Sequence, residues 1–359
     1  MSEIRVHLSG SNTNQQVLSM NKSPAFVAVD DGYAQTKLYG DGPDGKPVKL
    51  AIRTSVRAGR YGLGSISGEA VIGSYDTEEG DQFTISDDIA AENTQFDSFH
   101  TSSMNRALVN HVLIQGGYSG RDVKLIAGLP VADFFLADGK DEEKIAAKTA
   151  NLLKKVTSVS ANAPVANLRD VRIGCQAVAA FVDHVLDDDL KETADMDATI
   201  AVVDIGGRTT DIAVVVRGNS IDHEKSGTTN IGVLDVYKAL SKEIRAKFKT
   251  RDEFPLSQMD QAVRTGKIRL WNEENDVSAE VASIVREHET RIAREVERRL
   301  GSASNISGVL FVGGGSALFK GISARFRNGI MHDDPEFANA RGLHKYGRYM
   351  AVDTAQAAE

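Results

Sequence analysis

The sequence predicts an α/β protein of two domains, with an internal duplication and a ligand cleft between the two halves. Strand-like apolar runs end in glycine and aspartate clusters at three widely separated places, near Asp30, Asp204 and Gly313. Between these places strand-like and helix-like segments alternate, which is typical of α/β folds. The length of 359 residues corresponds to about two domains at ~100 to 200 residues each.

The first half opens with a predicted β-hairpin, because apolar residues 26–29 lead into a turn at 30–32 and an extended segment at 35–39. Residues 40–100 are polar and rich in glycine, and we expect them to form a small peripheral subdomain. Apolar spacing then predicts alternating elements: a helix over 104–115, a strand over 123–127, a helix over 141–156, a strand over 171–173 and a helix over 176–186.

The second half repeats the opening pattern. Residues 199–203 are apolar, 204–211 form a turn, and 212–216 are apolar again, which indicates a distant duplication of the first hairpin. Two amphipathic helices are predicted over 233–248 and over 276–300, the second with Asp276 as a possible N-cap. A short buried strand over 308–312 leads through three glycines into a helix expected to start near Ala317.

These elements predict the domain boundaries. Residues 1–24 are rich in Ser, Asn and Gln and are expected to be a flexible N-terminal arm. Residues 25–172 together with 340–359 form the first domain, and residues 173–339 form the second.

Composition excludes several classes of protein. The single cysteine, Cys175, excludes a disulfide framework and a zinc site built from several cysteines, and the eight histidines show no metal-ligand spacing. The net charge of −8 argues against direct, broad binding of DNA through phosphate neutralisation. No run of residues is apolar enough to span a bilayer or to serve as a signal peptide, so we expect a cytoplasmic protein without membrane association.

Two turns have the chemistry of phosphate-binding loops, residues 30–37 and residues 204–211. Glycine in such a loop lets the backbone N–H groups reach phosphate oxygens. Asp30 and Asp204 can hold water around Mg²⁺, and Lys37 can place a charge on the β/γ-phosphate oxygens. Neither turn fits the P-loop or the dinucleotide fingerprint. The third turn, residues 312–316, has three consecutive glycines, a pattern that indicates close approach of a ligand.

These three segments resemble, in the same order, the phosphate 1, phosphate 2 and adenosine motifs of the superfamily that unites actin, heat-shock chaperone ATPases and sugar kinases. Within it, four segments resemble the StbA/ParM family of bacterial actin-like plasmid segregation proteins: Asp30-Asp31-Gly32-Tyr33, Gly128-Leu129-Pro130-Val131, Arg264-Thr265-Gly266 and Asn339-Ala340-Arg341-Gly342-Leu343. The resemblance covers roughly residues 26–350. It implies an actin-like fold of two duplicated, ribonuclease H-like domains around a central nucleotide cleft.

The resemblance also implies a set of site residues. Gln176 is expected to orient the attacking water, and Asp204 to act with it in catalysis. Asp30 and Asp204 would face each other across Mg²⁺ and phosphate, both through water. Tyr33 departs from the Ser or Thr that many actin-like proteins have there. The expected nucleotide-binding residues are Asp30, Gly32, Tyr33, Lys37, Gly206, Gly207, Arg208, Thr209, Gly313, Gly314, Gly315 and Ser316. A basic segment at 264–267 is compatible with lining the cleft and with a solvated helix end, and is left out of the site.

The function implied is an ATPase, or also a GTPase, that needs Mg²⁺ and polymerises into filaments. Filament ends would engage a ParR-like adaptor bound to a centromere-like plasmid site and so segregate plasmid DNA. One alternative is a small-molecule kinase of the same superfamily, acting on a sugar or an acid. Others are a chromosomal cell-shape homologue of actin, a chaperone and a nucleotide-binding scaffold that does not hydrolyse.

Overall fold

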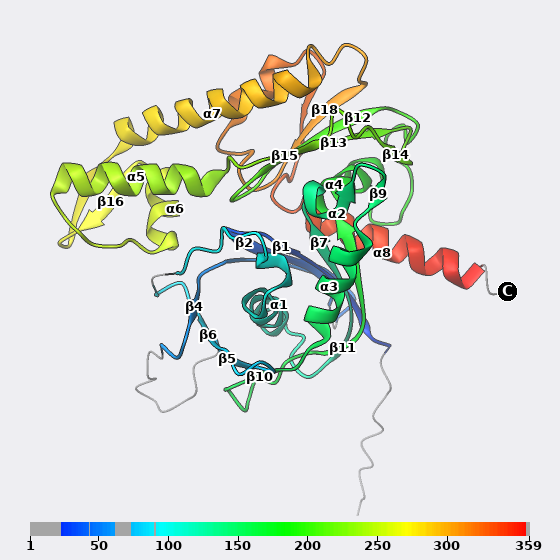
Figure 1. Ribbon diagram of the computed structural model, residues 1–359, viewed down its shortest axis with the longest axis horizontal. Coiled ribbons are helices and arrows are strands. Elements are labelled where there is room, and N and C mark those ends of the chain that lie inside the picture. The colour runs from blue at the N-terminus through cyan, green and yellow to red at the C-terminus, as the bar shows by residue number, and fades with distance from the viewer. Residues whose placement is uncertain (1–22, 43, 62–72, 90, 357–359) are drawn as a thin grey trace, which may run out of the picture.

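The computed structural model describes residues 23–42, 44–61, 73–89 and 91–356. Nearly all of the expected N-terminal arm, residues 1–24, lies outside the described residues. Two β-sheets form the centres of two lobes, which Figure 1 shows one above the other.

The sheet of the first lobe has the order β11-β7-β1-β2-β3. Its antiparallel part is β1 (Ala25–Asp31), β2 (Gln35–Asp41) and β3 (Pro47–Arg53), and β7 (Asp122–Leu129) and β11 (Asn167–Cys175) continue it in parallel. The hairpin β1–β2 places Asp30 directly opposite Lys37.

The sheet of the second lobe repeats this arrangement. Its order is β14-β13-β12-β18-β19, with β12 (Ile200–Ile205), β13 (Thr210–Val216), β14 (Ser220–Ile221), β18 (Gly308–Val312) and β19 (Gly329–Met331), and β15 (Gly227–Thr229) also pairs with β13. The hairpin β12–β13 places Asp204 opposite Asp211, the position that Lys37 has in the first lobe. An antiparallel hairpin beside parallel strands therefore occurs twice, as the duplicated sequence pattern predicts.

Helices cover these sheets and connect the lobes. The first lobe contains α1 (Ser103–Gln115) after the short η1 (Phe99–Thr101), then α2 (Val131–Phe134) and α3 (Glu142–Leu153). The next helix, α4 (Gln176–Val185), follows β11 and packs on β12 and β13 of the second lobe. The last helix, α8 (Ala338–Gln356), returns to pack against α4, β1, β2 and β7. Because α8 returns to the sheet of the first lobe, we propose that the first domain ends near the end of β11 and resumes near the start of α8, as the sequence predicts.

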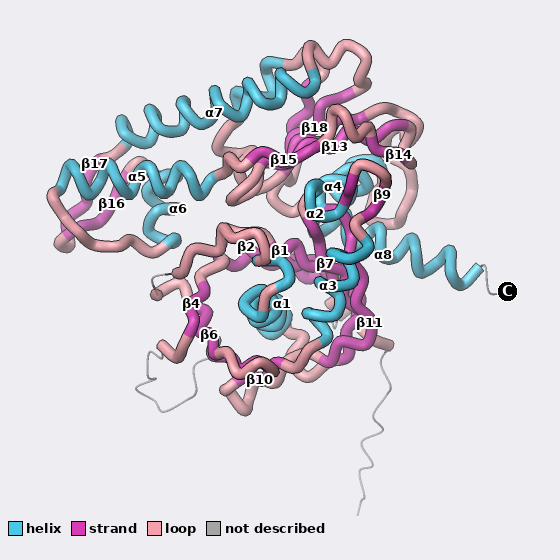
Figure 2. Tube along the Cα trace, viewed as in Figure 1, coloured by secondary structure: helices cyan, strands magenta, loops and turns pink. Residues whose placement is uncertain are grey.

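A smaller sheet closes the lower side of the first lobe. It has the order β10-β5-β6-β4, formed by β4 (Val56–Ala58), β5 (Ser74–Thr77), β6 (Gln82–Ile85) and β10 (Val156–Ser158). Figure 2 shows α1 enclosed between this sheet and β1–β2, so that residues 104–114 are buried all round the helix. A short hairpin of β8 (Phe135–Leu136) and β9 (Gly139–Lys140) follows α2.

The second lobe extends into a helical arm, formed by α5 (Val233–Phe248), α6 (Leu256–Thr265) and α7 (Ser278–Leu300). The hairpin of β16 (Lys267–Leu270) and β17 (Glu273–Asp276) closes its far end (Figure 1). Apolar faces of all three helices join the core of the second sheet. None of the described helices is long and apolar enough to cross a membrane.

Most predicted elements agree with the structure, and three differ. The helix expected near Ala317 is wrong: Leu318 and Phe319 both donate to the carbonyl of Gly315, so only a turn forms before the short η2 (Lys320–Arg325). The helix expected over 141–156 ends at Leu153, and Val156 belongs to β10. Asp276 lies in β17, and Val277 is the N-cap of α7.

Candidate functional site

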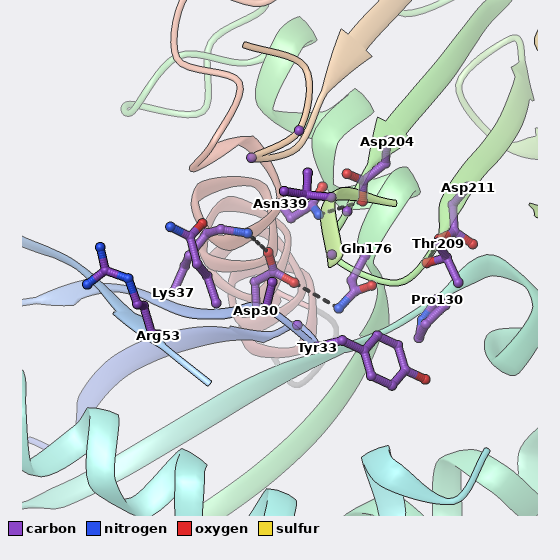
Figure 3. Close-up of a pocket in the computed structure, with 18 of the residues that line it drawn as sticks. Asp30, Tyr33, Lys37, Arg53, Pro130, Gln176, Asp204, Thr209, Asp211 and Asn339 are labelled. Carbon is purple, nitrogen blue, oxygen red and sulfur yellow. Dashed lines mark hydrogen bonds and ion pairs between the residues drawn. The ribbon is translucent and has the colours of Figure 1, made fainter. Parts of the chain in front are cut away.

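A cavity between the two lobes is lined by residues from both duplicated hairpins. Figure 3 shows its side chains converging from β1, β2, α4 and the end of β12. Eleven of the expected site residues line it: Asp30, Gly32, Tyr33, Lys37, Gln176, Asp204, Gly206, Gly207, Thr209, Gly314 and Gly315. The hairpins, far apart in sequence, thus meet where the phosphate motifs were expected.

Asp30 is the centre of the first-lobe half of the cavity. It lies near the end of β1, 2% exposed, and one carboxylate oxygen accepts from Lys37 Nζ at 3.0 Å. The other oxygen accepts from Gln176 Nε2 at 2.8 Å. Gln176 begins α4 directly after β11, so the parallel strand delivers its side chain to the carboxyl end of the sheet. The expected metal-site carboxylate and the expected water-orienting amide are therefore in direct contact.

Asp204 is the corresponding carboxylate of the second lobe. It is 5% exposed at the end of β12, and its Oδ2 accepts from Asn339 Nδ2 at 2.8 Å. Burial, reinforced by the negative charges of Asp30 and Asp211, raises the pKa of Asp204 to about 7. The cavity thus brings buried carboxylates close together, and an added cation would relieve their repulsion.

Lys37 is the buried positive charge of the cavity. Burial alone would lower the pKa of this ammonium group, but the charges of Asp30 and Asp204 outweigh burial and raise it. Lys37 therefore stays protonated and can act as a point charge toward an anionic ligand.

Asp211 is held by three donors. Its Oδ2 accepts from Thr209 Oγ1 at 2.8 Å, and its Oδ1 accepts from Thr228 Oγ1 and, at 3.3 Å, from the backbone N–H of Val131. The pKa of Asp211 is raised chiefly by burial. Because Val131 follows β7 of the first lobe, Asp211 also connects the two lobes.

The glycines of the loops permit close approach. A Cβ atom on Gly207 would lie 2.5 Å from Ala34 Cβ and 2.7 Å from Ala34 N, across the lobe boundary. Gly313 has a φ of 88°, and a Cβ there would lie 2.2 Å from Asp204 Oδ1. Side chains at these two positions would force the loops apart.

Three expected residues do not line the cavity. Arg208 places its guanidinium 5.1 Å from the ring centre of Tyr33 and pairs with Asp97 at 2.7 Å, which joins the lobes outside the cavity. Gly313, in the third turn, lies against Asp204 and the backbone of Ile205. Ser316 is fully buried and its hydroxyl donates back to the carbonyl of Val312.

The first turn rests on a buried ionic network that the sequence did not indicate. Asp31 is fully buried and accepts from Lys148 Nζ at 2.6 Å, from Asn105 Nδ2 at 2.6 Å and lies 3.3 Å from His100 Nδ1. Burial would raise the pKa of Asp31, but the Lys148 charge and the His100 contact outweigh it and lower the pKa to about 2. This network fixes the turn that carries Tyr33, whose ring lies 4.9 Å from that of His100.

Sequence reasoning also missed the mouth of the cavity. Arg53 of β3 pairs with Asp260 of α6 at 2.9 Å, and Asp260 also accepts from Tyr237 Oη and Arg264 Nε, each at 2.8 Å. All four line the cavity, as do His100, Pro130, Asp211 and Asn339. Some of these residues do have a sequence signal: Arg264 lies in a basic segment, Pro130 and Asn339 in family motifs, and Asp211 in the second phosphate turn. Arg53 and Asp260 have none.

Cys175 is not a nucleophile in this setting. It is buried as the N-cap of α4, and burial raises the pKa of its thiol to about 12. At neutral pH the thiolate fraction is negligible.

The residues present fit a hydrated magnesium ion. Mg²⁺ prefers one or two carboxylates with several waters and phosphate oxygens, and Asp30 and Asp204 supply two carboxylates from opposite loops. Among the described residues, no group of three or more His, Cys, Asp or Glu side chains could bind a metal directly. The side-chain oxygen of Asn339, buried in the lining, has no hydrogen-bond partner within the described part of the chain. That oxygen can accept from a metal-bound water or from a ligand.

Comparisons with solved structures define the class of protein. The chain is similar to the archaeal actin homologue Ta0583, with 22% identity and a TM-score of 0.68, over 90% of this chain and 99% of that one. It is similar to the ParM of a 15-stranded filament from Clostridium botulinum, with 17% identity and a TM-score of 0.68, over 91% and 99%. The actin-like Alp7A gives 14% identity and a TM-score of 0.68, over 92% and 98%. The chain has an actin-like fold, and the predicted fold class is confirmed.

Family models identify the relatives more closely. The model described as plasmid segregation protein ParM, N-terminal, matches residues 26–186. The model described as archaeal actin homologue MreB-like, C-terminal, matches residues 202–322. A search of curated proteins found no match. The predicted resemblance to the StbA/ParM family of actin-like proteins is thereby confirmed.

Proposed function

We propose that this chain is an actin-like nucleoside triphosphatase that binds Mg-ATP or Mg-GTP in the cavity between its lobes and polymerises when the nucleotide is bound. One observation carries this proposal: Asp30 and Asp204, equivalent residues of the two duplicated hairpins, face the same cavity with Lys37 and Gln176 beside them. A ligand that contacts both halves can hold the lobes closed.

The relatives support two parts of the proposal, nucleotide binding and filament formation. One solved structure of the similar archaeal actin homologue is a complex with ADP, and one similar ParM was solved as a filament. In this chain the glycine loops can present backbone N–H groups to phosphate oxygens, and Gln176 can align a water by accepting and donating hydrogen bonds.

A cellular role in plasmid segregation follows from the ParM resemblance. Filaments would engage a DNA-bound, ParR-like adaptor in the cytoplasm, since a net charge of −8 disfavours direct binding of DNA by this chain.

The kinase alternative needs a carboxylate free to accept a proton from an acceptor hydroxyl. Asp211 stands at the second phosphate loop, but its two oxygens already accept from Thr209, Thr228 and the backbone of Val131. These hydrogen bonds occupy three of the roughly four acceptor positions of the carboxylate and hold its orientation, which favours hydrolysis over transfer to a small molecule.

Sedimentation and phosphate release test the proposal together. The full chain, well above micromolar concentration, should pellet on adding Mg-ATP or Mg-GTP and release inorganic phosphate without any acceptor. Asp204→Ala should do neither. A chain that stays monomeric with both nucleotides, or that transfers the γ-phosphoryl group to an added sugar or acid and releases no inorganic phosphate without one, contradicts the proposal and favours the kinase.

A further inference from the structure

The far end of the helical arm carries an exposed tryptophan. Trp271 is 69% exposed at the tip of the β16–β17 hairpin. Leu270 pairs with Glu273, so Trp271 and Asn272 alone form the turn, with φ angles of 49° and 65°. Such a turn favours glycine and asparagine, and a bulky residue with a positive φ is an outlier. The ring is braced by Phe248 of α5, whose centre lies 6.5 Å away. A large apolar ring is therefore held in solvent by a turn whose backbone conformation is unfavourable for tryptophan.

The opposite end of the molecule carries an apolar cavity. It has a volume of about 270 Å³ and lies between α2, α4, β13 and α8, lined chiefly by Phe134, Val178, Val182, Val215, Leu343 and Tyr346. Figure 1, drawn with the longest axis horizontal, has the β16 hairpin at the left end and β14, α4 and α8 toward the right. The indole and the cavity therefore cannot meet within one chain.

The chemistry of the two surfaces is complementary. An indole needs an apolar surrounding for its rings and an acceptor for its N–H. The cavity lining includes Ser220, whose hydroxyl donates to Asn219 Oδ1 and keeps its own lone pairs as acceptors. Exposed Glu273 directly follows the turn that carries Trp271, whereas exposed Lys140 lines the cavity. Opposite charges would orient the hairpin as it enters.

We infer that Trp271 of one copy of this chain inserts into the apolar cavity of the next copy, as the main head-to-tail contact of the filament. Trp271 (the knob) and the apolar cavity (the hole) lie at opposite ends of one chain, so the contact between two copies is heterologous. Repeated from copy to copy, such a contact builds an open filament unless the rotation between copies closes it into a ring. This inference rests on the proposed polymerisation and adds the surface that carries it. The α4–α8 pair, which forms one wall of the cavity, also joins the lobes beside Gln176, so lobe closure on nucleotide would reshape the cavity.

Trp271 is the only tryptophan in the chain, so its fluorescence reports the contact directly. On adding Mg-ATP to the full chain, the emission should shift to shorter wavelength and quenching by acrylamide should fall several-fold as filaments form. Filaments whose tryptophan stays as quenchable as in the monomer overturn the inference and leave the proposed function intact. Absence of filaments with ATP and GTP overturns both. A shift on adding anionic phospholipid vesicles without nucleotide assigns the side chain to a lipid surface instead.

Paired variants test the geometry. Trp271→Ala removes the knob, and Val182→Asp places a charge in the apolar hole. Each variant alone should raise the critical concentration for polymerisation at least tenfold, while its nucleotide affinity changes less than twofold. Mixed in equal amounts, the two variants retain one intact knob and one intact hole, and should form a heterodimer that does not elongate in sedimentation velocity. Leu153→Ala, which removes an apolar side chain of similar exposure, 55%, on α3, is the matched control and should polymerise normally. Normal polymerisation of either surface variant, or a mixture that stays monomeric, contradicts the pairing.

Discussion

Gln176 donates a hydrogen bond to Asp30 across 2.8 Å, which joins the start of α4 to the end of β1 inside the cavity. The proposed roles of the two residues are different, since Asp30 would hold a hydrated metal and Gln176 would orient a water. Their contact means that a change in either one alters the position of the other. The variants below separate these effects.

Gln176→Ala should slow hydrolysis about 10- to 1,000-fold with little change in nucleotide affinity, because a water-orienting group acts chiefly on the transition state. Phosphate release in single turnovers, together with a separate binding titration, measures the two effects. Gln176→Glu is the informative companion: it would place a second carboxylate against Asp30 and should weaken Mg-nucleotide binding as well. Unimpaired turnover in Gln176→Ala would remove the residue from the mechanism.

Asp204→Asn should stabilise the nucleotide-free protein at neutral and higher pH. The pKa of Asp204 is raised to about 7 in the folded chain, from a usual value of 3.8, chiefly by burial. The folded state therefore holds more protons between these values, so stability from this group falls as pH rises from 4 to 7. Removing the charge should raise the free energy of unfolding by roughly 1 to 4 kcal/mol at pH 8, since each pKa unit corresponds to about 1.4 kcal/mol.

Urea unfolding at pH 8 and pH 4.5 without nucleotide measures this effect. The gain at pH 8 should shrink strongly at pH 4.5, where Asp204 of the folded parent chain is protonated and as uncharged as the asparagine of the variant. An equal increase in the free energy of unfolding at both pH values would mean that the Asp204 carboxylate is not destabilised in the folded state.

Arg53→Ala should speed the release of bound nucleotide. Arg53 and Asp260 close the mouth of the cavity from opposite lobes at 2.9 Å, with side chains 31% and 13% exposed. Partly exposed ion pairs contribute about 0.2 to 1 kcal/mol, so we expect release to quicken by a few-fold. Displacement of a fluorescent nucleotide in a stopped-flow instrument gives the rate. Arg60→Ala, which breaks the exposed pair with Asp76 in the first lobe, should leave that rate unchanged.

Gly207→Ala should hold the lobes apart. The added Cβ would lie 2.5 Å from Ala34 Cβ and 2.7 Å from Ala34 N, and backbone on both sides cannot move without opening the cavity. Small-angle scattering should show a larger radius of gyration for the variant without nucleotide, and polymerisation should weaken. Gly321→Ala, whose added Cβ would meet the flexible carboxylate of Glu289 rather than backbone, serves as the control for a glycine substitution away from the cavity. Identical scattering of Gly207→Ala and the parent chain would show that the loops do not define the closed form.

The helices and strands that could be predicted are those whose residue pattern lies within a few neighbouring positions of the chain. Asp30 and Asp204 each end an apolar strand and are each followed by a glycine turn, so the duplicated hairpins and their meeting at one cavity could be anticipated. Gln176 came from the family resemblance together with its place at the start of a helix.

The residues that sequence reasoning missed act through distant contacts. Arg53 and Asp260 are 207 residues apart, and neither stands in a motif. The hairpin that carries Trp271 has no glycine or proline in its turn, so the usual signal of a β-hairpin is absent. Near Ala317 the local signal misled, because the backbone leaves the helical region at Phe319, with φ −108° and ψ 44°, and Phe319 becomes the N-cap of η2.

Titration calorimetry of Mg-nucleotide on the full chain tests the central claim, that the cavity between the duplicated hairpins is the nucleotide site. The account predicts one site per chain, bound only weakly without Mg²⁺, and loss of most of the Mg-dependent affinity in Asp204→Ala. The control Asp170→Ala changes an exposed aspartate on β11 that pairs with Arg172 and should bind normally. Unchanged Mg-nucleotide affinity in a folded Asp204→Ala protein would contradict the account.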